Sequence, residues 1–226
     1  MRVQDIIPVT IRKKLLKFHQ NLIWKSTFDT YKKVIEKNEK PSKKLIKRLI
    51  YAWGNQGFSA QIDYLDTCIE YGLSTKGTIF ECGSGLSTLV LGVIAKNKNR
   101  KMISLEHIEF WAQKIQSKLD ENHLNNNILY VRKLKNYGDF DWYNIDNLEI
   151  PKIGLSICDA PPSNTLGGRR GFINLLKDKL ESNSIILVDD TIREDEQLMI
   201  EEWKKIIPME VNFYGNFDPH AVIKLK

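Results

Sequence analysis

The chain has 226 residues, 42% of them hydrophobic, so it is long enough for one well-buried α/β domain with an extension and short for two full domains. No run approaches the roughly 18 consecutive apolar residues that span a bilayer, and basic residues interrupt the first apolar stretch, so we expect neither a membrane span nor a secretory signal. Residues 1–50 carry a net charge of +10 and the remaining residues a net charge of −4, which disfavours a nucleic-acid surface over the whole protein.

The first 58 residues are expected to be helical. Apolar residues recur at helical spacing over residues 11–23, with basic side chains between them, and a second apolar segment follows at 28–35. A third helix is expected over residues 41–53, where Pro and Ser form a good helix start. We therefore expect a basic helical N-terminal extension over residues 1–58 and the main domain over residues 59–226.

From about residue 77 the pattern changes to strands that alternate with helices. Near-continuous apolar runs separated by helices are typical of parallel strands buried on both faces. The expected strands are 78–82, 101–106, 128–131, 153–159 and 184–190, and the expected helices are 87–97, 110–119, 171–180 and 194–207. Two final strands, 211–214 and 221–225, are too close in sequence for a crossover helix and favour a hairpin. We predict a doubly wound, Rossmann-like α/β fold with a mostly parallel seven-stranded sheet and a C-terminal antiparallel hairpin.

The segment 80–88, FECGSGLST, predicts a strand end, a tight glycine turn and a helix start, an arrangement that presents backbone N–H groups to a ligand. The dinucleotide pattern G-x-G-x-x-G/A is incomplete, because Thr88 stands in place of its third small residue, and no GK[ST] follows for a P-loop. Glu81 ends the strand just before Gly83, where its carboxylate would repel a pyrophosphate but would accept hydrogen bonds from an ammonium group. The expected ligand is therefore not a phosphate.

Glu106 ends the next expected strand, 21 residues after Gly85. An acidic group at this position can accept two hydrogen bonds from a ribose diol. The alternative is a solvated glutamate at the end of a strand. A nucleoside with a cation near its 5′ end and no phosphate describes S-adenosylmethionine, which is the expected cofactor.

These motifs together resemble the class I S-adenosylmethionine-dependent methyltransferases. FECGSGLST is similar to their first motif and ISLEH to their acidic second motif, whereas SICDAPP, GGRRG and IILVDDTIRED resemble the branch of catechol and small-molecule O-methyltransferases. The resemblance covers roughly residues 50–226. It implies that the first motif holds the methionine end, that Glu106 holds the ribose, and that residues around Tyr137 to Asp139 border the adenine or the cleft. The cofactor-binding residues predicted in this way are Glu81, Gly83, Ser84, Gly85, Ser87, Glu106, His107, Gly138, Asp139 and Asp159.

Three carboxylates are expected together at the ends of the fourth and fifth strands, those of Asp159, Asp189 and Asp190. Hard oxygen ligands of this kind suit Mg²⁺ or Ca²⁺. The resemblance implies a divalent ion at these positions, where it would lower the pKa of an acceptor hydroxyl and orient it. In the alternative, Asp159 only positions the acceptor, and Asp190 caps the following segment or pairs with Arg193.

The general base stays open between Asp159 and His107, because Pro162 stands where catechol-type enzymes carry a catalytic lysine. Arg169 and Arg170 suit an anionic acceptor such as a phosphorylated or acidic sugar; the alternative is a pair of solvated surface arginines.

Trp142 either lines an acceptor pocket or belongs to the core. The predicted function is methyl transfer to a hydroxyl group of a small molecule, sugar or glycan, with a divalent metal as an assisting ion. The alternative is an RNA or protein methyltransferase that uses the basic extension to bind its substrate. A binding module without activity is a third class, which the three aspartates argue against.

The basic extension contains no catalytic motif. A basic amphipathic helix can lie on an anionic membrane surface. It can also pack over the cofactor cleft or against a second subunit, which would make a homodimer. The three cysteines lack CxxC spacing and suit a reducing compartment, so the expected localisation is cytoplasmic, at the inner membrane surface if the membrane alternative holds.

Overall fold

The computed structural model describes residues 8–54, 60–215 and 218–226. The chain divides into two compact units, Met1–Ile62 and Asp63–Lys226, and each is described separately. The predicted boundary after residue 58 falls on residues outside the described ranges and stays a prediction. Within the described ranges, no helix is long and apolar enough to cross a membrane.

The first unit contains the helices α1 (Val9–Glu36) and α2 (Lys43–Trp53), which pack against each other. The sequence predicts two separate helices in the region of α1, but α1 is continuous over 28 residues. No proline or glycine interrupts it, and the hydroxyl groups of Ser26 and Thr27 donate to the carbonyl of Ile23 within the helix. The polar residues between the two apolar segments therefore do not end the helix.

The first half of α1 carries a row of exposed apolar side chains. Ile11, Leu15, Phe18 and Leu22 follow one another at intervals of three or four residues and are 48% to 68% exposed. Basic residues surround this row. The expectations for this surface, an anionic membrane, the cofactor cleft or a second subunit, stay predictions.

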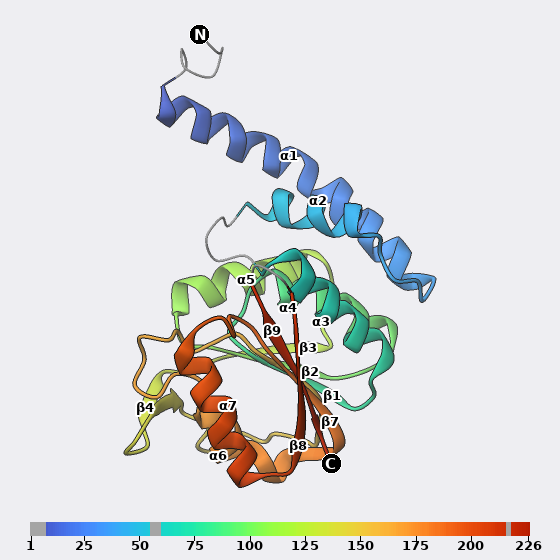
Figure 1. Ribbon diagram of the computed structural model, residues 1–226. Helices are drawn as coiled ribbons and strands as arrows, with labels where there is room; N and C mark the ends of the chain where they lie inside the picture. Colours follow the sequence, from blue (N-terminus) through green and yellow to red (C-terminus); the bar gives the residue numbers. More distant parts are fainter. Residues whose placement is uncertain (1–7, 55–59, 216–217) are drawn as a thin grey trace. The chain divides into compact units, whose positions relative to one another are not determined.

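The second unit is built on a seven-stranded sheet with the strand order β3-β2-β1-β6-β7-β9-β8 (Figure 1). These strands are β1 (Thr78–Cys82), β2 (Met102–Glu106), β3 (Asn127–Val131), β6 (Ile153–Cys158), β7 (Leu180–Val188), β8 (Met209–Tyr214) and β9 (His220–Leu225). The first five run parallel, whereas β9 pairs antiparallel with both β7 and β8. The predicted doubly wound α/β fold with a C-terminal antiparallel hairpin is confirmed.

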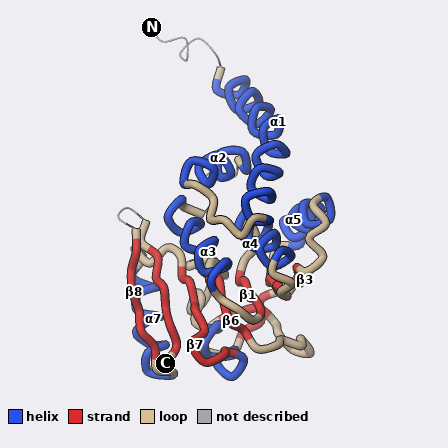
Figure 2. The backbone as a smooth tube through the Cα atoms, turned by 90° about the vertical axis from the view of Figure 1, so that its right-hand side faces the viewer, coloured by secondary structure: helices blue, strands red, loops and turns tan. Residues whose placement is uncertain are grey.

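Helices cover both faces of this sheet (Figures 1 and 2). Their bounds are α3 (Ile62–Ser74), α4 (Leu86–Asn97) and α5 (Glu109–Glu121) on one face, and α6 (Gly171–Leu176) and α7 (Glu194–Ile206) on the other. Strands β1, β2 and β6 are buried along their whole length. Their continuous apolar sequences follow from this double coverage, because neither face of a strand meets water.

In the second unit, two further regions differ from the sequence prediction. The expected helix over 171–180 ends at Leu176 and continues as a 3₁₀ turn, because β7 begins at Leu180, where it pairs with Ile153. A separate hairpin of β4 (Leu134–Asn136) and β5 (Asp141–Tyr143) has no counterpart in the prediction. Strands of three residues carry too little periodicity to be recognised.

Candidate active site

The carboxyl ends of β1, β6 and β7 are tied together by backbone hydrogen bonds. The amide of Asp159 donates to the carbonyl of Cys82, and the amide of Asp189 donates to that of Cys158, each over 3.2 Å. Ligands of open α/β sheets bind outside the carboxyl ends of the strands. The loops that carry most of the predicted site residues therefore meet at one edge of the sheet.

The two glycines of the turn after β1, Gly83 and Gly85, lie in different backbone conformations and different surroundings. Gly83 has a φ of 89°, and a Cβ atom placed there would lie 2.8 Å from the Cβ atom of Ala160. Gly85 has extended backbone, and a Cβ atom placed there would meet no atom within 4 Å. Gly83 is thus required by the fold, whereas the absence of a side chain at Gly85 leaves open space at the start of α4.

Glu81 is buried below this turn, with only 1% of its surface exposed. Its Oε2 atom accepts hydrogen bonds from the hydroxyl groups of Thr88 (2.7 Å) and Ser104 (2.8 Å). Its Oε1 atom has no hydrogen-bond partner among the described residues. Burial raises the pKa of Glu81 to about 7. An unpaired buried carboxylate oxygen is costly, and it fits a ligand that brings a donor, such as an amino group. Ser87, the other residue predicted here, is buried in the first turn of α4.

Glu106, at the end of β2, is the acceptor of four hydrogen bonds. Its Oε2 atom accepts from the amide (3.2 Å) and the hydroxyl group (2.8 Å) of Ser84, and its Oε1 atom accepts from the amides of His107 (2.8 Å) and Ile108 (2.9 Å). Burial raises the pKa of this carboxyl, but the hydrogen bonds from His107, Ile108 and Ser84 outweigh it, so the pKa lies below its ordinary value. Glu106 is therefore a fixed anion that joins the turns after β1 and β2.

The imidazole Nδ1 atom of His107 lies 3.3 Å from Glu106 Oε1. The ring also makes an edge-on contact with the ring of Tyr143 in β5. His107 thus lies beside the predicted ribose-binding residue, and its own role in cofactor binding stays a prediction.

Gly138 and Asp139 form the tip of the β4–β5 hairpin. Gly138 has a φ of 95°, its amide donates to Asn136 Oδ1 (3.0 Å), and a Cβ atom placed there would meet nothing within 4 Å. Asp139 is exposed. Their predicted place beside the adenine stays a prediction.

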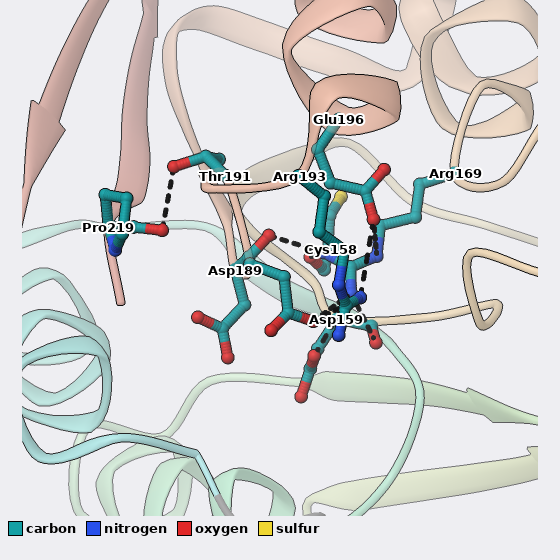
Figure 3. Close-up of polar contacts among 9 residues, drawn as sticks. Cys158, Asp159, Arg169, Asp189, Thr191, Arg193, Glu196 and Pro219 are labelled. Carbon is teal, nitrogen blue, oxygen red and sulfur yellow. Dashed lines mark hydrogen bonds and ion pairs between the residues drawn. The ribbon is translucent and has the colours of Figure 1, made fainter. Parts of the chain in front are cut away.

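Arg169 differs from both sequence expectations, because it is neither a surface residue nor free to bind an acceptor. It is 1% exposed, and its guanidinium lies between the ends of β6 and β7 (Figure 3). Its Nη1 atom donates to the carbonyls of Asp189 (2.6 Å) and Cys158 (3.2 Å). Its Nη2 atom donates to the carbonyl of Asp159 (3.1 Å) and to Asp190 Oδ2 (3.0 Å). A single buried cation therefore holds this end of the sheet together.

The expected metal site at Asp159, Asp189 and Asp190 does not fit this geometry. Among the described residues, no group of three or more His, Cys, Asp or Glu side chains is arranged to hold a metal ion. The guanidinium of Arg169 already lies 3.4 Å from Asp159 Oδ1 and 3.0 Å from Asp190 Oδ2, and a divalent cation there would stand against it. The pairing of Asp190 with Arg193, the alternative from the sequence, is present at 2.8 Å.

The aspartates differ in charge state. Burial raises the pKa of Asp159 to about 6 and that of Asp189 to about 8, and the positive charge of Arg169 lowers both. Asp189 is 6% exposed, whereas the side chain of Asp159 is 36% exposed. Asp159 is therefore the more accessible of the two and the one that is mainly ionised at neutral pH.

The other predicted acceptor residues lie further from this cluster of charges. Arg170 is partly exposed and its guanidinium donates to Glu202 Oε1 over 2.7 Å. Trp142 is fully buried in the hydrophobic core and packs so closely on Gly171 that a Cβ atom there would lie 2.3 Å from the indole. The core alternative therefore describes Trp142, and the acceptor role of Arg170 stays a prediction.

Three further residues shape the site without having been predicted. Thr88 and Ser104 hold Glu81, and Trp111 donates its indole N–H to the carbonyl of Ser84 (2.7 Å). The signal for Thr88 and Ser104 is a hydroxyl residue inside an otherwise apolar, buried element, because such a hydroxyl needs a partner. For Trp111 the sequence offers no comparable signal.

The fold is shared with solved methyltransferases, among them O-methyltransferases. A solved O-methyltransferase from Bacillus cereus, in complex with SAH, matches with a TM-score of 0.57 and 14% identity over 82% of this chain and 92% of that chain. A putative caffeoyl-CoA O-methyltransferase from Staphylococcus aureus matches with a TM-score of 0.54 and 13% identity over 96% and 100% of the two chains. Precorrin-6y C5,15-methyltransferase from Geobacter metallireducens GS-15 matches with a TM-score of 0.53 and 14% identity over 76% and 91%.

No protein-family model matches the sequence, and no curated protein matches it significantly. At 13% to 14% identity the matching structures establish the fold alone. What the site does is therefore inferred from its own residues.

Proposed function

We propose that the protein is an S-adenosylmethionine-dependent methyltransferase that acts on a hydroxyl group of a small molecule or glycan. The observation that carries this proposal is a pair of buried glutamates, Glu81 and Glu106, at the ends of adjacent strands around the open glycine turn. Two carboxylates suit a ligand that is cationic at one end and carries a diol at the other. They do not suit a pyrophosphate, because like charges repel.

The residues fit S-adenosylmethionine or its product, S-adenosylhomocysteine. The unpaired Oε1 atom of Glu81 matches the amino group of the methionine end. The open space beside Gly85 accepts the ligand close to the backbone. Of the four donors on Glu106, only the Ser84 hydroxyl group belongs to a rotatable side chain, so a ribose hydroxyl replaces that donor most easily.

S-adenosylmethionine, when bound, supplies an electrophilic methyl group. Asp159 is the candidate general base, because it ends β6 at the same edge of the sheet and its side chain is accessible and mainly ionised at neutral pH. Its carboxylate takes the proton of the acceptor hydroxyl as that oxygen bonds to the methyl carbon, while the electrons of the broken carbon–sulfur bond remain on sulfur. His107, the other candidate base, lies with its Nδ1 atom 3.3 Å from Glu106 Oε1.

The chain beyond residue 50 has a net charge of −4, which disfavours a nucleic-acid surface on the part of the chain that carries the candidate site. The test is transfer of a tritium-labelled methyl group into a fractionated cell extract. We expect label in the small-molecule or saccharide fraction. Asp159→Asn should lower the rate of methyl transfer at least about 100-fold. Label in RNA or protein would instead support the alternative function.

A further inference from the structure

Arg169 reaches the centre of the acidic cluster from the loop that precedes α6. The close-up in Figure 3 shows its side chain among Asp159, Asp189 and Glu196, which come from the ends of β6 and β7 and from the first turn of α7. An arginine side chain is rarely buried without charged partners. Here it is 1% exposed, so its contacts rather than water stabilise the charge.

Of the five N–H groups of the guanidinium, the four on Nη1 and Nη2 have oxygen acceptors. The two on Nη1 face the main-chain carbonyls of Cys158 and Asp189, and those on Nη2 face Asp159 and Asp190. The Nε atom lies 3.9 Å from Glu196 Oε1, which is an ion pair and too long for a hydrogen bond. The Nη1 and Nη2 atoms are occupied by these contacts, and the Nε atom is buried without a hydrogen-bond partner among the described residues, so we infer that Arg169 acts on the reaction through Asp159.

We propose that Arg169 takes the place of the divalent cation at the ends of β6 and β7, so that methyl transfer by this protein needs no metal ion. This inference rests on the proposed function for its catalytic part. A single guanidinium pairs with the carboxylates of Asp159 and Asp190 and fixes the main chain at Asp159. It cannot bind the acceptor oxygen as a metal ion does, and the acceptor proton therefore passes to Asp159. Arg169 is in this sense a positioning residue.

The same geometry predicts a latent metal site. Asp159 and Asp190 both lie within 3.4 Å of the guanidinium, so its removal leaves two carboxylates facing one vacated position. Arg193 remains on Asp190 at 2.8 Å, but it is 43% exposed and can turn into solvent. Loss of the charge at residue 169 should therefore create affinity for a divalent cation.

The test is calorimetric titration with MnCl₂ of protein that has been freed of metal with EDTA and dialysed. We expect no binding by the wild type at micromolar concentrations and at least tenfold tighter binding by Arg169→Gln. Arg169→Lys, which keeps a positive charge, should show no gain. Arg170→Gln is the matched control, because Arg170 is the neighbouring arginine and pairs with Glu202 away from the three aspartates.

Micromolar Mn²⁺ binding by the wild type that is lost in Asp190→Asn would overturn the inference, as would folded Arg169→Gln without any gain. If Arg169→Gln does not fold, the wild-type titration still decides. Methyl transfer should be unchanged in EDTA, and activity that is lost in EDTA and restored by Mn²⁺ would overturn it as well. A parallel titration with S-adenosylhomocysteine separates the two claims, because failure to bind that ligand contradicts the proposed function and leaves the metal result to be judged by itself.

Discussion

Gly85→Ala is expected to weaken the binding of S-adenosylhomocysteine at least tenfold without a measurable change in the melting temperature. The backbone at Gly85 is extended, and a Cβ atom placed there would meet no protein atom within 4 Å. The substitution should therefore leave the stability of the fold unchanged. The added methyl group would project into the space that we assign to the cofactor. Calorimetry with S-adenosylhomocysteine and thermal unfolding of the same sample measure both effects.

Gly83→Ala is the matched control in the same turn. Its φ of 89° and the 2.8 Å approach to Ala160 predict a loss of about 1–3 kcal/mol in the free energy of unfolding. Unchanged affinity in a folded Gly85→Ala variant would mean that the ligand does not approach the turn as closely as we infer. A large drop in its melting temperature would mean that Gly85 serves the fold.

The affinity for S-adenosylhomocysteine is also expected to rise roughly fivefold to tenfold between pH 6 and pH 7.5, with Glu81 as the cause. The pKa of Glu81 is about 7, against an ordinary value of 4.5, because the side chain is buried. Below this pKa the carboxyl is neutral and cannot pair with the ligand's ammonium group. As the pH rises through 7 the carboxylate forms, and the affinity increases by up to about tenfold per pH unit. At still higher pH the ligand's own amino group loses its proton, and the affinity falls again.

Two controls separate Glu81 from other titrating groups. Glu81→Gln removes the charge at nearly constant shape and should abolish the rise between pH 6 and pH 7.5. 5′-Methylthioadenosine lacks the amino-acid end of the cofactor, so its affinity should show no such rise in the wild type. A rise that persists in Glu81→Gln would assign the titration to another residue.

The sheet could be predicted from sequence because burial on both faces imposes a continuous apolar pattern. Strands β1 and β6 show this directly, since every residue in them is buried. The glycine turn after β1 and the glutamate at the end of β2 could likewise be predicted, because both depend on local sequence at a strand end. The β4–β5 hairpin differs from the prediction because strands of three residues carry too little periodicity, and α1 differs because the polar residues between its two apolar segments do not end the helix.

Arg169 could not be placed from sequence. It adjoins Arg170 in the segment GGRRG, yet one of the two is buried and the other partly exposed. The difference comes from the fold, which turns one side chain under the ends of β6 and β7 and leaves the next on the surface beside Glu202. Three aspartates at the ends of strands predict a metal site only if no basic residue is already there. Whether a basic residue is there depends on the folded sheet, because Arg169 lies about 20 residues before Asp189 and Asp190 in the sequence.

The central claim is that the glycine turn with Glu81 and Glu106 binds a phosphate-free nucleoside cofactor. Calorimetric titration of the wild type with S-adenosylhomocysteine, with NAD as the control ligand and Glu106→Ala as the control variant, tests it most directly. We expect a micromolar dissociation constant for S-adenosylhomocysteine, at least tenfold weaker binding by folded Glu106→Ala, and no binding of NAD. Absence of S-adenosylhomocysteine binding by the wild type, or equally tight binding of NAD, would contradict the account.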